Sequence, residues 1–284
     1  MQNILICNTT KASTPYMIPY INCSIYSYEE LCFFLYENIP LLEKVFIPKD
    51  LLPFLKEELK LNRLYKVLED MIKRKESARN LILAIFSAKS YYNEGEVRKW
   101  RGAYDRFYQS PWYEREKETA DCYMHYKKYE RAKSHYEFII KKETELEADF
   151  LSKVYYNLGV CCCKQFDFAG GKLHFLKANE VKKDALYLQS YFAVLQLCDN
   201  EAFVRTEVRE KGLSLEEFGK IVDEVDLYKE EAKKLEDAKR LANATYHKQH
   251  GKIGEFYAQI DDMLSSFKED YKREGYESID RSMR

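Results

Sequence analysis

Residues 149–178 read DFLSKVYYNLGVCCCKQFDFAGGKLHFLKA, and their spacing of small and aromatic residues decides the predicted fold. Gly171 follows Gly159 by 12 positions, and Phe175 follows it by 16. A small residue in one helix lets a second helix approach closely, and an aromatic residue one turn further on fills the gap between neighbouring helices. The stretch therefore predicts a helix–turn–helix hairpin whose helices come closest at the two glycines.

The same spacing occurs twice more along the chain. The two further triads are Ala88, Trp100 and Tyr104, and Ala120, Ala132 and Tyr136. Tyr91 and Tyr123 each follow the first small residue by three positions, which strengthens the match. The triads begin 32 and then 39 positions apart, so we expect the extra length within residues 141–149. Trp100 is a departure, because a small residue is usual at its position.

Hairpins with this pattern resemble the tetratricopeptide repeat, a helix–turn–helix unit of roughly 34 residues that stacks into a curved solenoid. The resemblance covers roughly residues 81–185. It implies a protein that binds other proteins or peptides on the concave face of the stack. A chance match within a helical, tyrosine-rich chain is the alternative. Residues 187–198 and 201–210 would supply a fourth hairpin, which the sequence leaves open.

We expect a mostly α-helical fold with three parts. A tetratricopeptide-like α-solenoid of helical hairpins over residues 79–212 follows a small N-terminal α/β or α domain over 1–78 and precedes a C-terminal helical cap over 213–284. In the N-terminal domain, residues 3–7 and 18–26 are rich in isoleucine and tyrosine and are predicted to pair as strands. Ser27 followed by Glu30 has the form of a capping box and predicts a helix start. Further helices are expected from Asp50 and around residues 61–72.

The C-terminal part carries two apolar stripes at helical spacing. Phe218, Val225 and Ala232 recur every seven positions, as do Ile221, Tyr228, Leu235 and Ala242. A second stripe consists of Ile253, Phe256, Tyr257, Ile260, Leu264, Phe267 and Tyr271. Two helices with one apolar stripe each must bury it, so we expect an antiparallel pair that caps the solenoid. A dimeric coiled coil, which would make the protein a homodimer, is the alternative.

Charge and composition exclude several classes of protein. The 284 residues carry 46 basic and 47 acidic side chains, and no segment gathers basic residues as a nucleic-acid interface requires. No apolar run approaches the roughly 20 residues that span a bilayer, and no secretory signal is visible. Eight cysteines without paired C-x-x-C spacing indicate neither a disulfide framework nor a zinc site. We expect a soluble protein of the reducing cytoplasm.

Residues that often carry chemistry have structural explanations in this chain. No catalytic triad or nucleophile elbow stands out, and the first 94 residues lack the glycine that a phosphate-binding loop needs. We therefore expect no catalysis, no cofactor and no metal. His247 and His250 lie three apart, but a metal site needs more ligands. His135 and His174 are expected on exposed helix faces, and the cysteines at 161–163 as small buried residues.

The predicted binding groove is lined by first-helix residues around the small positions of each hairpin. They are Lys89, Tyr92, Lys117, Asp121, His125, Lys153, Tyr156, Asn157 and Lys164. Four lysines against one aspartate predict a basic wall that attracts an acidic segment of a partner. Ordinary solvated lysines are the alternative. Some members of the family clamp the C-terminal carboxylates of chaperone tails; Lys117 and Asn157 match two clamp positions, but Asp121 stands where asparagine is expected.

The sequence thus predicts a non-catalytic scaffold or adaptor that binds a protein or peptide. Two alternatives stay open. One is a regulator whose repeats sense a signalling peptide, and the other is an enzyme with its site in the N-terminal domain. The identity of the partner, the pathway, the oligomeric state and the role of the N-terminal domain do not follow from the sequence.

Overall fold

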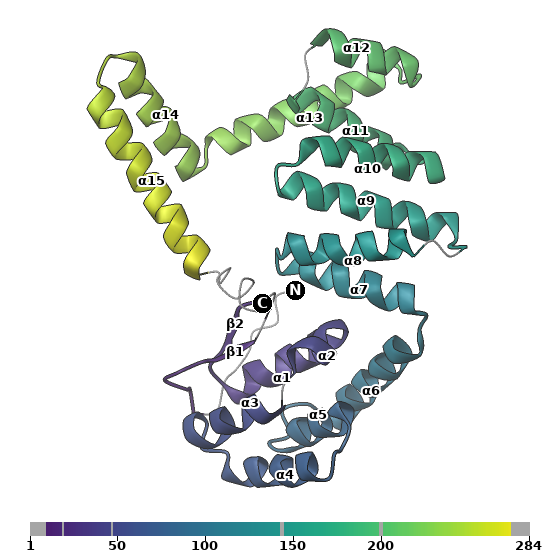
Figure 1. Cartoon of the computed structure of the whole chain (residues 1–284), viewed down its shortest axis with the longest axis vertical. Helices are drawn as coiled ribbons and strands as arrows, with labels where there is room; N and C mark the ends of the chain where they lie inside the picture. The colour runs from purple at the N-terminus through teal and green to yellow at the C-terminus, as the bar shows by residue number, and fades with distance from the viewer. Residues whose placement is uncertain (1–9, 19, 47, 143–144, 199–200, 274–284) are drawn as a thin grey trace. The chain divides into compact units, whose positions relative to one another are not determined.

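A computed structural model of the chain describes residues 10–18, 20–46, 48–142, 145–198 and 201–273. The contacts divide the chain into two compact units, Met1–Thr144 and Glu145–Arg284. The described residues are mostly α-helical, with one two-stranded sheet (Figure 1). The predicted mostly α-helical class is confirmed.

The sheet is a hairpin close to the start of the first unit. Strand β1 (Tyr16–Ile18) pairs antiparallel with β2 (Cys23–Ile25), and Tyr16 lies opposite Ile25. Tyr20 and Asn22 in the connection have positive φ angles of 71° and 55°, as a tight reversal requires. The strand predicted over residues 18–26 is therefore wrong in extent, because the chain reverses within it. Its expected partner, residues 3–7, lies outside the described residues.

Helices form the remainder of the first unit. In chain order they are α1 (Tyr28–Glu37), the 3-10 turn η1 (Ile39–Leu41), α2 (Leu42–Val45), α3 (Pro48–Pro53), the π-helical turn η2 (Phe54–Glu58), α4 (Asn62–Lys73), α5 (Ala78–Ser87), α6 (Glu94–Gln109), α7 (Trp112–His125) and α8 (Tyr129–Lys141). Ser27 caps α1 as predicted, because its Oγ accepts a hydrogen bond from the N–H of Glu30 at 3.1 Å. The helix expected from Asp50 begins two residues earlier, at Pro48.

Helices α1, α5 and α6 share one hydrophobic core. Phe86 and Trp100 are buried, with ring centroids 5.1 Å apart. The Trp100 Nε1–H donates to the carbonyl of Leu35 at 3.1 Å, and the Tyr28 hydroxyl donates to the carbonyl of Ile85 at 2.5 Å. These bonds join α1 to helices beyond residue 78, so α5 and α6 belong to the N-terminal compact unit. The sequence predicts domain boundaries at residues 78 and 212, and whether the parts that they separate fold independently stays a prediction.

Two hairpins contain the triads of small and aromatic residues. They are α7–α8 in the first unit, and α9 (Ala148–Lys164) with α10 (Phe168–Val181) in the second. Ala120, Ala132 and Tyr136 are fully buried in the first hairpin. In the second, a Cβ on Gly159 would lie 2.7 Å from the Phe175 ring, and a Cβ on Gly171 would lie 2.4 Å from the Cys163 sulfur. The predicted close approach of the helices is confirmed.

The same two hairpins share the geometry of their turns. Lys127 and Phe166, each seven positions after the small residue of the first helix, have left-handed φ angles of 57° and 62°. The next N–H in each turn reaches back to the first helix: that of Lys128 donates to the Tyr123 carbonyl at 2.8 Å, and that of Asp167 to the Cys162 carbonyl at 2.9 Å. These bonds satisfy carbonyls that a helix end otherwise leaves unpaired. The two hairpins are thus copies of one local structure.

The first predicted triad does not form such a hairpin. Helix α5 ends at Ser87, so Ala88 is its exposed C-cap residue rather than a contact point within a helix. Trp100 and Tyr104 pack against each other, with ring centroids 5.1 Å apart, inside the N-terminal unit. The prediction of a close-contact pair at Ala88 is wrong, because the indole at position 100 is too large for such an approach and packs against α1 and α5 instead.

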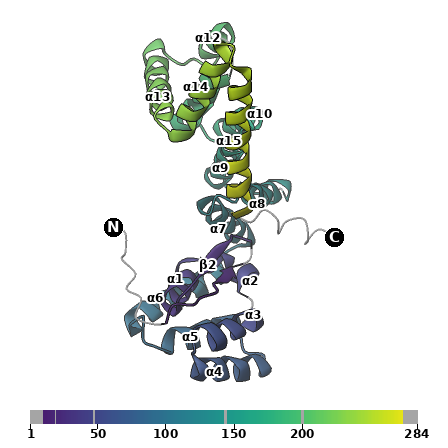
Figure 2. The same ribbon diagram turned by 90° about the vertical axis from the view of Figure 1, so that its left-hand side faces the viewer.

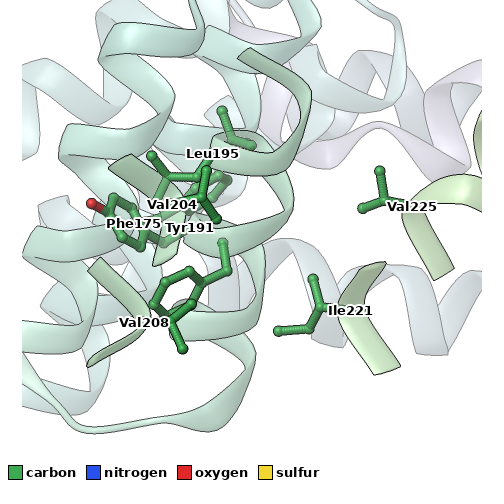
Figure 3. Close-up of a cluster of buried hydrophobic side chains, with 9 residues drawn as sticks. Phe175, Tyr191, Leu195, Val204, Val208, Ile221 and Val225 are labelled. Carbon is green, nitrogen blue, oxygen red and sulfur yellow. The ribbon is translucent and has the colours of Figure 1, made fainter. Parts of the chain in front are cut away.

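The second unit continues with the hairpin that the sequence left open. Helices α11 (Ala185–Cys198) and α12 (Glu201–Glu210) follow α10, and the start of α13 (Leu215–Lys233) packs against α11. One buried cluster holds these helices together (Figure 3): Phe175, Tyr191, Phe192, Val194, Leu195, Val204, Val208, Ile221 and Val225. The cluster extends from α10 to α13, so it forms a single core for this part of the unit.

The C-terminal helices differ from the predicted long helix. Helix α13 ends at Lys233, and α14 (Glu236–Gln249) begins after Leu235, which is its exposed N-cap residue. The predicted stripe is buried only at its start, because Ile221 and Val225 are buried while Tyr228 is 64% exposed. Helices α14 and α15 (Ile253–Arg273) lie side by side in both views (Figure 1, Figure 2) and enclose Ala244 and Met263. The antiparallel pair therefore forms between α14 and α15.

Candidate functional site

The first turn of α9 carries a charged cluster in the second unit. Lys153 Nζ lies 2.6 Å from Asp149 Oδ2, and Lys182 at the end of α10 donates to Asp149 Oδ1. Hydrogen bonds from these two lysines lower the pKa of Asp149 from 3.8 to about 2. The carboxylate also lies near the N-terminus of α9, where the helix dipole favours negative charge. Two cations thus share one carboxylate, and all three side chains are accessible to solvent.

An aromatic pair lies one turn further along α9. The Tyr156 ring is 5.2 Å from that of Tyr187 in α11 and 5.4 Å from that of Phe175. The hydroxyls of Ser152 and Tyr187 are 3.3 Å apart and form a hydrogen bond. Tyr156 is half-buried, as is the neighbouring Asn157, so both present atoms to solvent. Aromatic and hydrogen-bonding groups therefore occur together on consecutive first helices.

We call this surface the α9 face. It comprises Asp149, Lys153, Tyr156, Asn157 and Lys182, and the buried Tyr187 of α11 packs against the Tyr156 ring and supports it. The structure brings together three residues that the sequence predicted for the groove, Lys153, Tyr156 and Asn157. Lys164 is exposed at the other end of α9, roughly 16 Å along the helix from Lys153 at 1.5 Å per residue. Lys164 is therefore not part of the α9 face.

Sequence reasoning missed Asp149 and Lys182 of the α9 face and the Tyr187 that supports it. Asp149 and Lys153 have the i, i+4 spacing of a helical ion pair, which was a usable signal. Lys182 joins them from 33 positions away, and only the closed hairpin places it there. Tyr187 comes from α11, in the hairpin that the sequence leaves open, so its contact with Tyr156 was not predicted.

In the first unit, the groove residues of α7 bind each other. Lys117 Nζ lies 2.7 Å from Asp121 Oδ2, and Asp121 Oδ1 accepts a hydrogen bond from the Tyr136 hydroxyl of α8 at 2.5 Å. Asp121 thus ties the two helices of the hairpin together. His125 is exposed at the end of α7, with its ring edge-on to that of Tyr126.

These ion pairs weaken the basic wall that the sequence predicts. Lys117 and Lys153 each have an aspartate partner, so half of the four lysines have their charge compensated within the protein. Asp121 lies four positions after Lys117, and Asp149 lies four positions before Lys153, so both ion pairs could be predicted from the sequence. The predicted groove includes Asp121 but not Asp149. The attraction for an acidic segment is correspondingly smaller on these helices.

Lys89 and Tyr92 do not lie on a first helix. Both follow the end of α5, in the connection to α6. Tyr92 packs into the N-terminal core, with its ring 4.5 Å from that of Tyr36 and 5.3 Å from that of Phe86. Burial raises the pKa of the Tyr92 hydroxyl well above its usual range. Lys89 lines a separate cleft with the first turn of α4.

The histidines predicted on exposed faces are partly buried instead. The His135 side chain, 15% exposed, contacts the Glu116 carboxylate and stacks on Tyr123. His174 occupies the equivalent place in its hairpin and stacks on Tyr155. Both rings fill the seam between the two helices of a hairpin. The prediction of exposure was wrong. Each histidine lies three positions after the second small residue of its hairpin, and from there its side chain contacts the first helix.

The cysteines at 161–163 are packed as predicted. Cys161 and Cys162 are buried, and Cys163 is half-buried beside Gly171. Burial raises the pKa of the Cys163 thiol to about 11, which keeps it protonated and unreactive at neutral pH. Among the residues that the structure describes, no three His, Cys, Asp or Glu side chains gather as a metal site would require.

Within the described ranges, no helix combines the length and apolar character that crossing a bilayer needs. Comparisons of the chain with protein-family models, with curated proteins and with solved structures find no match. Any functional assignment therefore depends on the geometry of the surfaces themselves.

Proposed function

We propose that the protein is a tetratricopeptide-like scaffold that binds an extended segment of a partner protein on the α9 face. The observation that carries the proposal is the Tyr156–Tyr187 contact, in which the buried Tyr187 of α11 fixes the half-buried Tyr156 ring of α9. Tyrosines are favoured in interfaces because each supplies a large rigid apolar area and a polar hydroxyl. Asn157, the next residue of α9, adds a half-buried amide group, and the ion pair of Lys153 with Asp149 lies one turn earlier on the same helix.

The repeated hairpin geometry supports the proposal. The α7–α8 and α9–α10 hairpins have the same local structure: left-handed turn residues at Lys127 and Phe166, and buried small residues at Ala120 and Gly159. Repeats of this kind present equivalent first-helix positions to a partner, and within the second unit α9 and α11 are in contact through Tyr156 and Tyr187. An extended segment that lies across those positions meets a regular series of side chains. Binding of this kind involves no chemical step.

A displayed library of random dodecapeptides tests the proposal when it is selected on the full chain. We expect selected peptides to lose affinity by about tenfold or more for Tyr156→Ala, since a buried interfacial tyrosine commonly contributes that much. Tyr155→Ala is the matched control. Tyr155 is the adjacent half-buried tyrosine of α9, but it stacks on His174 in the hairpin seam.

Both variants lose a packed ring, so their thermal melts should be lowered alike. Affinity that falls for Tyr156→Ala and stays within about twofold for Tyr155→Ala supports the α9 face. Equal losses in the two variants, or peptides whose affinity neither variant changes, would refute it. Asn157→Ala gives a second measure with a smaller change of volume, and we expect it to weaken binding as well.

A further inference from the structure

A cleft in the first unit lies between the start of α4 and the end of α5. Its volume is about 780 Å³, within the range of pockets that hold small ligands or peptide side chains. The lining residues are Lys60, Leu61, Asn62, Arg63, Leu64, Val67, Ala84, Ser87, Ala88 and Lys89. The cleft belongs entirely to the N-terminal unit and shares no residue with the α9 face.

All the charged side chains that line the cleft are positive. Lys60, Arg63 and Lys89 are exposed cations, and no acidic side chain lines the cleft. Within the described part of the chain, none of the three side chains forms an ion pair, in contrast to Lys117 and Lys153. Glu58 lies close in sequence, but its carboxylate accepts hydrogen bonds from Ser13 and Thr14. The lining of the cleft therefore carries three cations and no carboxylate.

The lining of the cleft also includes apolar side chains, among them Leu61, Leu64 and Val67. Val67 is 45% exposed, although valine is usually buried. Ala84 of α5 and its C-cap residue Ala88 also line the cleft, and their side chains of a single methyl group leave room for an added side chain. An aliphatic or aromatic group placed there would cover Val67 and remove apolar surface from water.

The rim that carries Lys89 is held in place. The Lys89 N–H donates to the Tyr28 hydroxyl at 3.3 Å, and that hydroxyl donates to the Ile85 carbonyl. Tyr28 is completely buried, so the end of α5 is tied to the core of the unit. A fixed rim lowers the ordering cost that binding otherwise incurs.

We propose that this cleft is a second binding site, which takes an acidic peptide segment with one apolar anchor residue. The anchor would lie between Val67 and the two alanines, and the carboxylates on either side would meet Lys60, Arg63 and Lys89. A lining of three cations and several apolar side chains matches a peptide with both features. A nucleic-acid backbone matches only the charge, and it is recognised by larger basic surfaces.

Fluorescence anisotropy of a labelled octapeptide, Glu-Glu-Asp-Leu-Phe-Asp-Glu-Glu, tests the proposal with the full chain. We expect saturable binding that weakens as salt is raised, because screening shortens the reach of the charges. The triple variant K60E/R63E/K89E should weaken binding at least about tenfold, since attraction becomes repulsion at three positions. Ala88→Trp should weaken it similarly without a change of charge, because the indole fills the cleft.

The matched control is R98E/K99E/R101E, which makes the same change of charge on exposed residues of α6 in the same unit. We expect its affinity to stay within about twofold of the wild type. Replacing Leu-Phe of the peptide with Ala-Ala, or its acids with glutamine, should each abolish binding. All variants change exposed positions, and an unaltered thermal melt verifies that they fold.

Four outcomes would overturn the proposal. No binding up to about 1 mM peptide would show that the cleft does not recognise this chemistry. Equal weakening by the control triple variant, or none by Ala88→Trp, would show attraction to the overall charge rather than occupation of the cleft. Tighter binding of a labelled DNA duplex that K60E/R63E/K89E abolishes would assign the cations to nucleic acid.

Discussion

At the scale of single residues, Gly159 determines how closely α9 and α10 approach. An added Cβ would lie 2.7 Å from the Phe175 ring, and that ring is buried in the core of the second unit. We expect Gly159→Ala to cost about 1–3 kcal/mol, because the ring cannot move away without disturbing its neighbours. Urea denaturation of the full chain measures the loss as a lower midpoint.

Gly219→Ala is the internal comparison for that loss. Gly219 lies within α13 of the same unit, and nothing stands within 4 Å of the Cβ that alanine would add. Alanine there should stabilise the helix by about 0.5–1 kcal/mol, since glycine loses more backbone freedom on folding. Destabilisation by both substitutions, or by neither, would contradict the close approach at Gly159.

Phe166 combines two unfavourable features at the α9–α10 turn. Its side chain is 81% exposed, and its backbone has a left-handed φ of 62°. Such a conformation costs a residue with a Cβ about 1–2 kcal/mol. We expect Phe166→Gly to raise the unfolding free energy by about 0.5–1 kcal/mol, after the larger entropy of glycine in the unfolded chain is subtracted. Phe166→Ala keeps the Cβ, so a comparable gain from it would contradict the explanation.

The charged cluster at Asp149 makes a prediction about pH. Because the folded-state pKa of Asp149 lies below its unfolded value, the carboxylate contributes stability above about pH 4 and loses it as the pH falls towards 2. The difference in urea midpoint between the wild type and Asp149→Asn should therefore shrink from pH 5 to pH 2. A difference that stays constant over this range would show that the charge of Asp149 does not matter.

These residues also show what the sequence could and could not predict. Gly159, Gly171 and Phe175 were predictable because a close helix contact demands small residues at a fixed spacing. The Asp149–Lys182 contact was not, since it depends on where the end of α10 lies relative to the start of α9.

At the scale of elements, α13 changes from buried to exposed along one stripe. Ile221 is 6% exposed and packs in the cluster with α11 and α12, whereas Tyr228, two turns further on, is 64% exposed. We expect Ile221→Ala to cost about 2–5 kcal/mol and Tyr228→Ala to stay within about 0.5 kcal/mol of the wild type. Equal losses, read from thermal melts at one protein concentration, would mean that the stripe is covered along its whole length.

The break after α13 explains why the C-terminal prediction was only half right. The apolar spacing of seven continues to Ala242, and neither glycine nor proline marks the end of the helix near Lys234. A periodic pattern specifies which face is apolar, but it does not specify whether one helix or two carry it. An antiparallel pair of helices could be predicted here, because Gly251, with a φ of 75°, lies at the reversal between α14 and α15.

At the scale of the whole molecule, the contacts divide the chain between α8 and α9. Lys141 and Lys142 at this junction are exposed. We expect brief trypsin treatment to cleave there first and to yield two fragments of nearly equal mass that remain helical by circular dichroism. Early cleavage near residues 78 or 212 instead would favour the three-part division that the sequence predicts.

Photo-crosslinking tests the central claim, peptide binding on the α9 face, most directly. A peptide selected on the full chain, with a benzoyl-phenylalanine at its apolar position, is irradiated in the complex, and the labelled fragments are identified by mass spectrometry. We predict crosslinks to residues 148–164 and 185–198, which form α9 and α11, and their loss when Tyr156→Ala replaces the wild type. Crosslinks confined to α4 and α5, or to α13–α15, would contradict the claim.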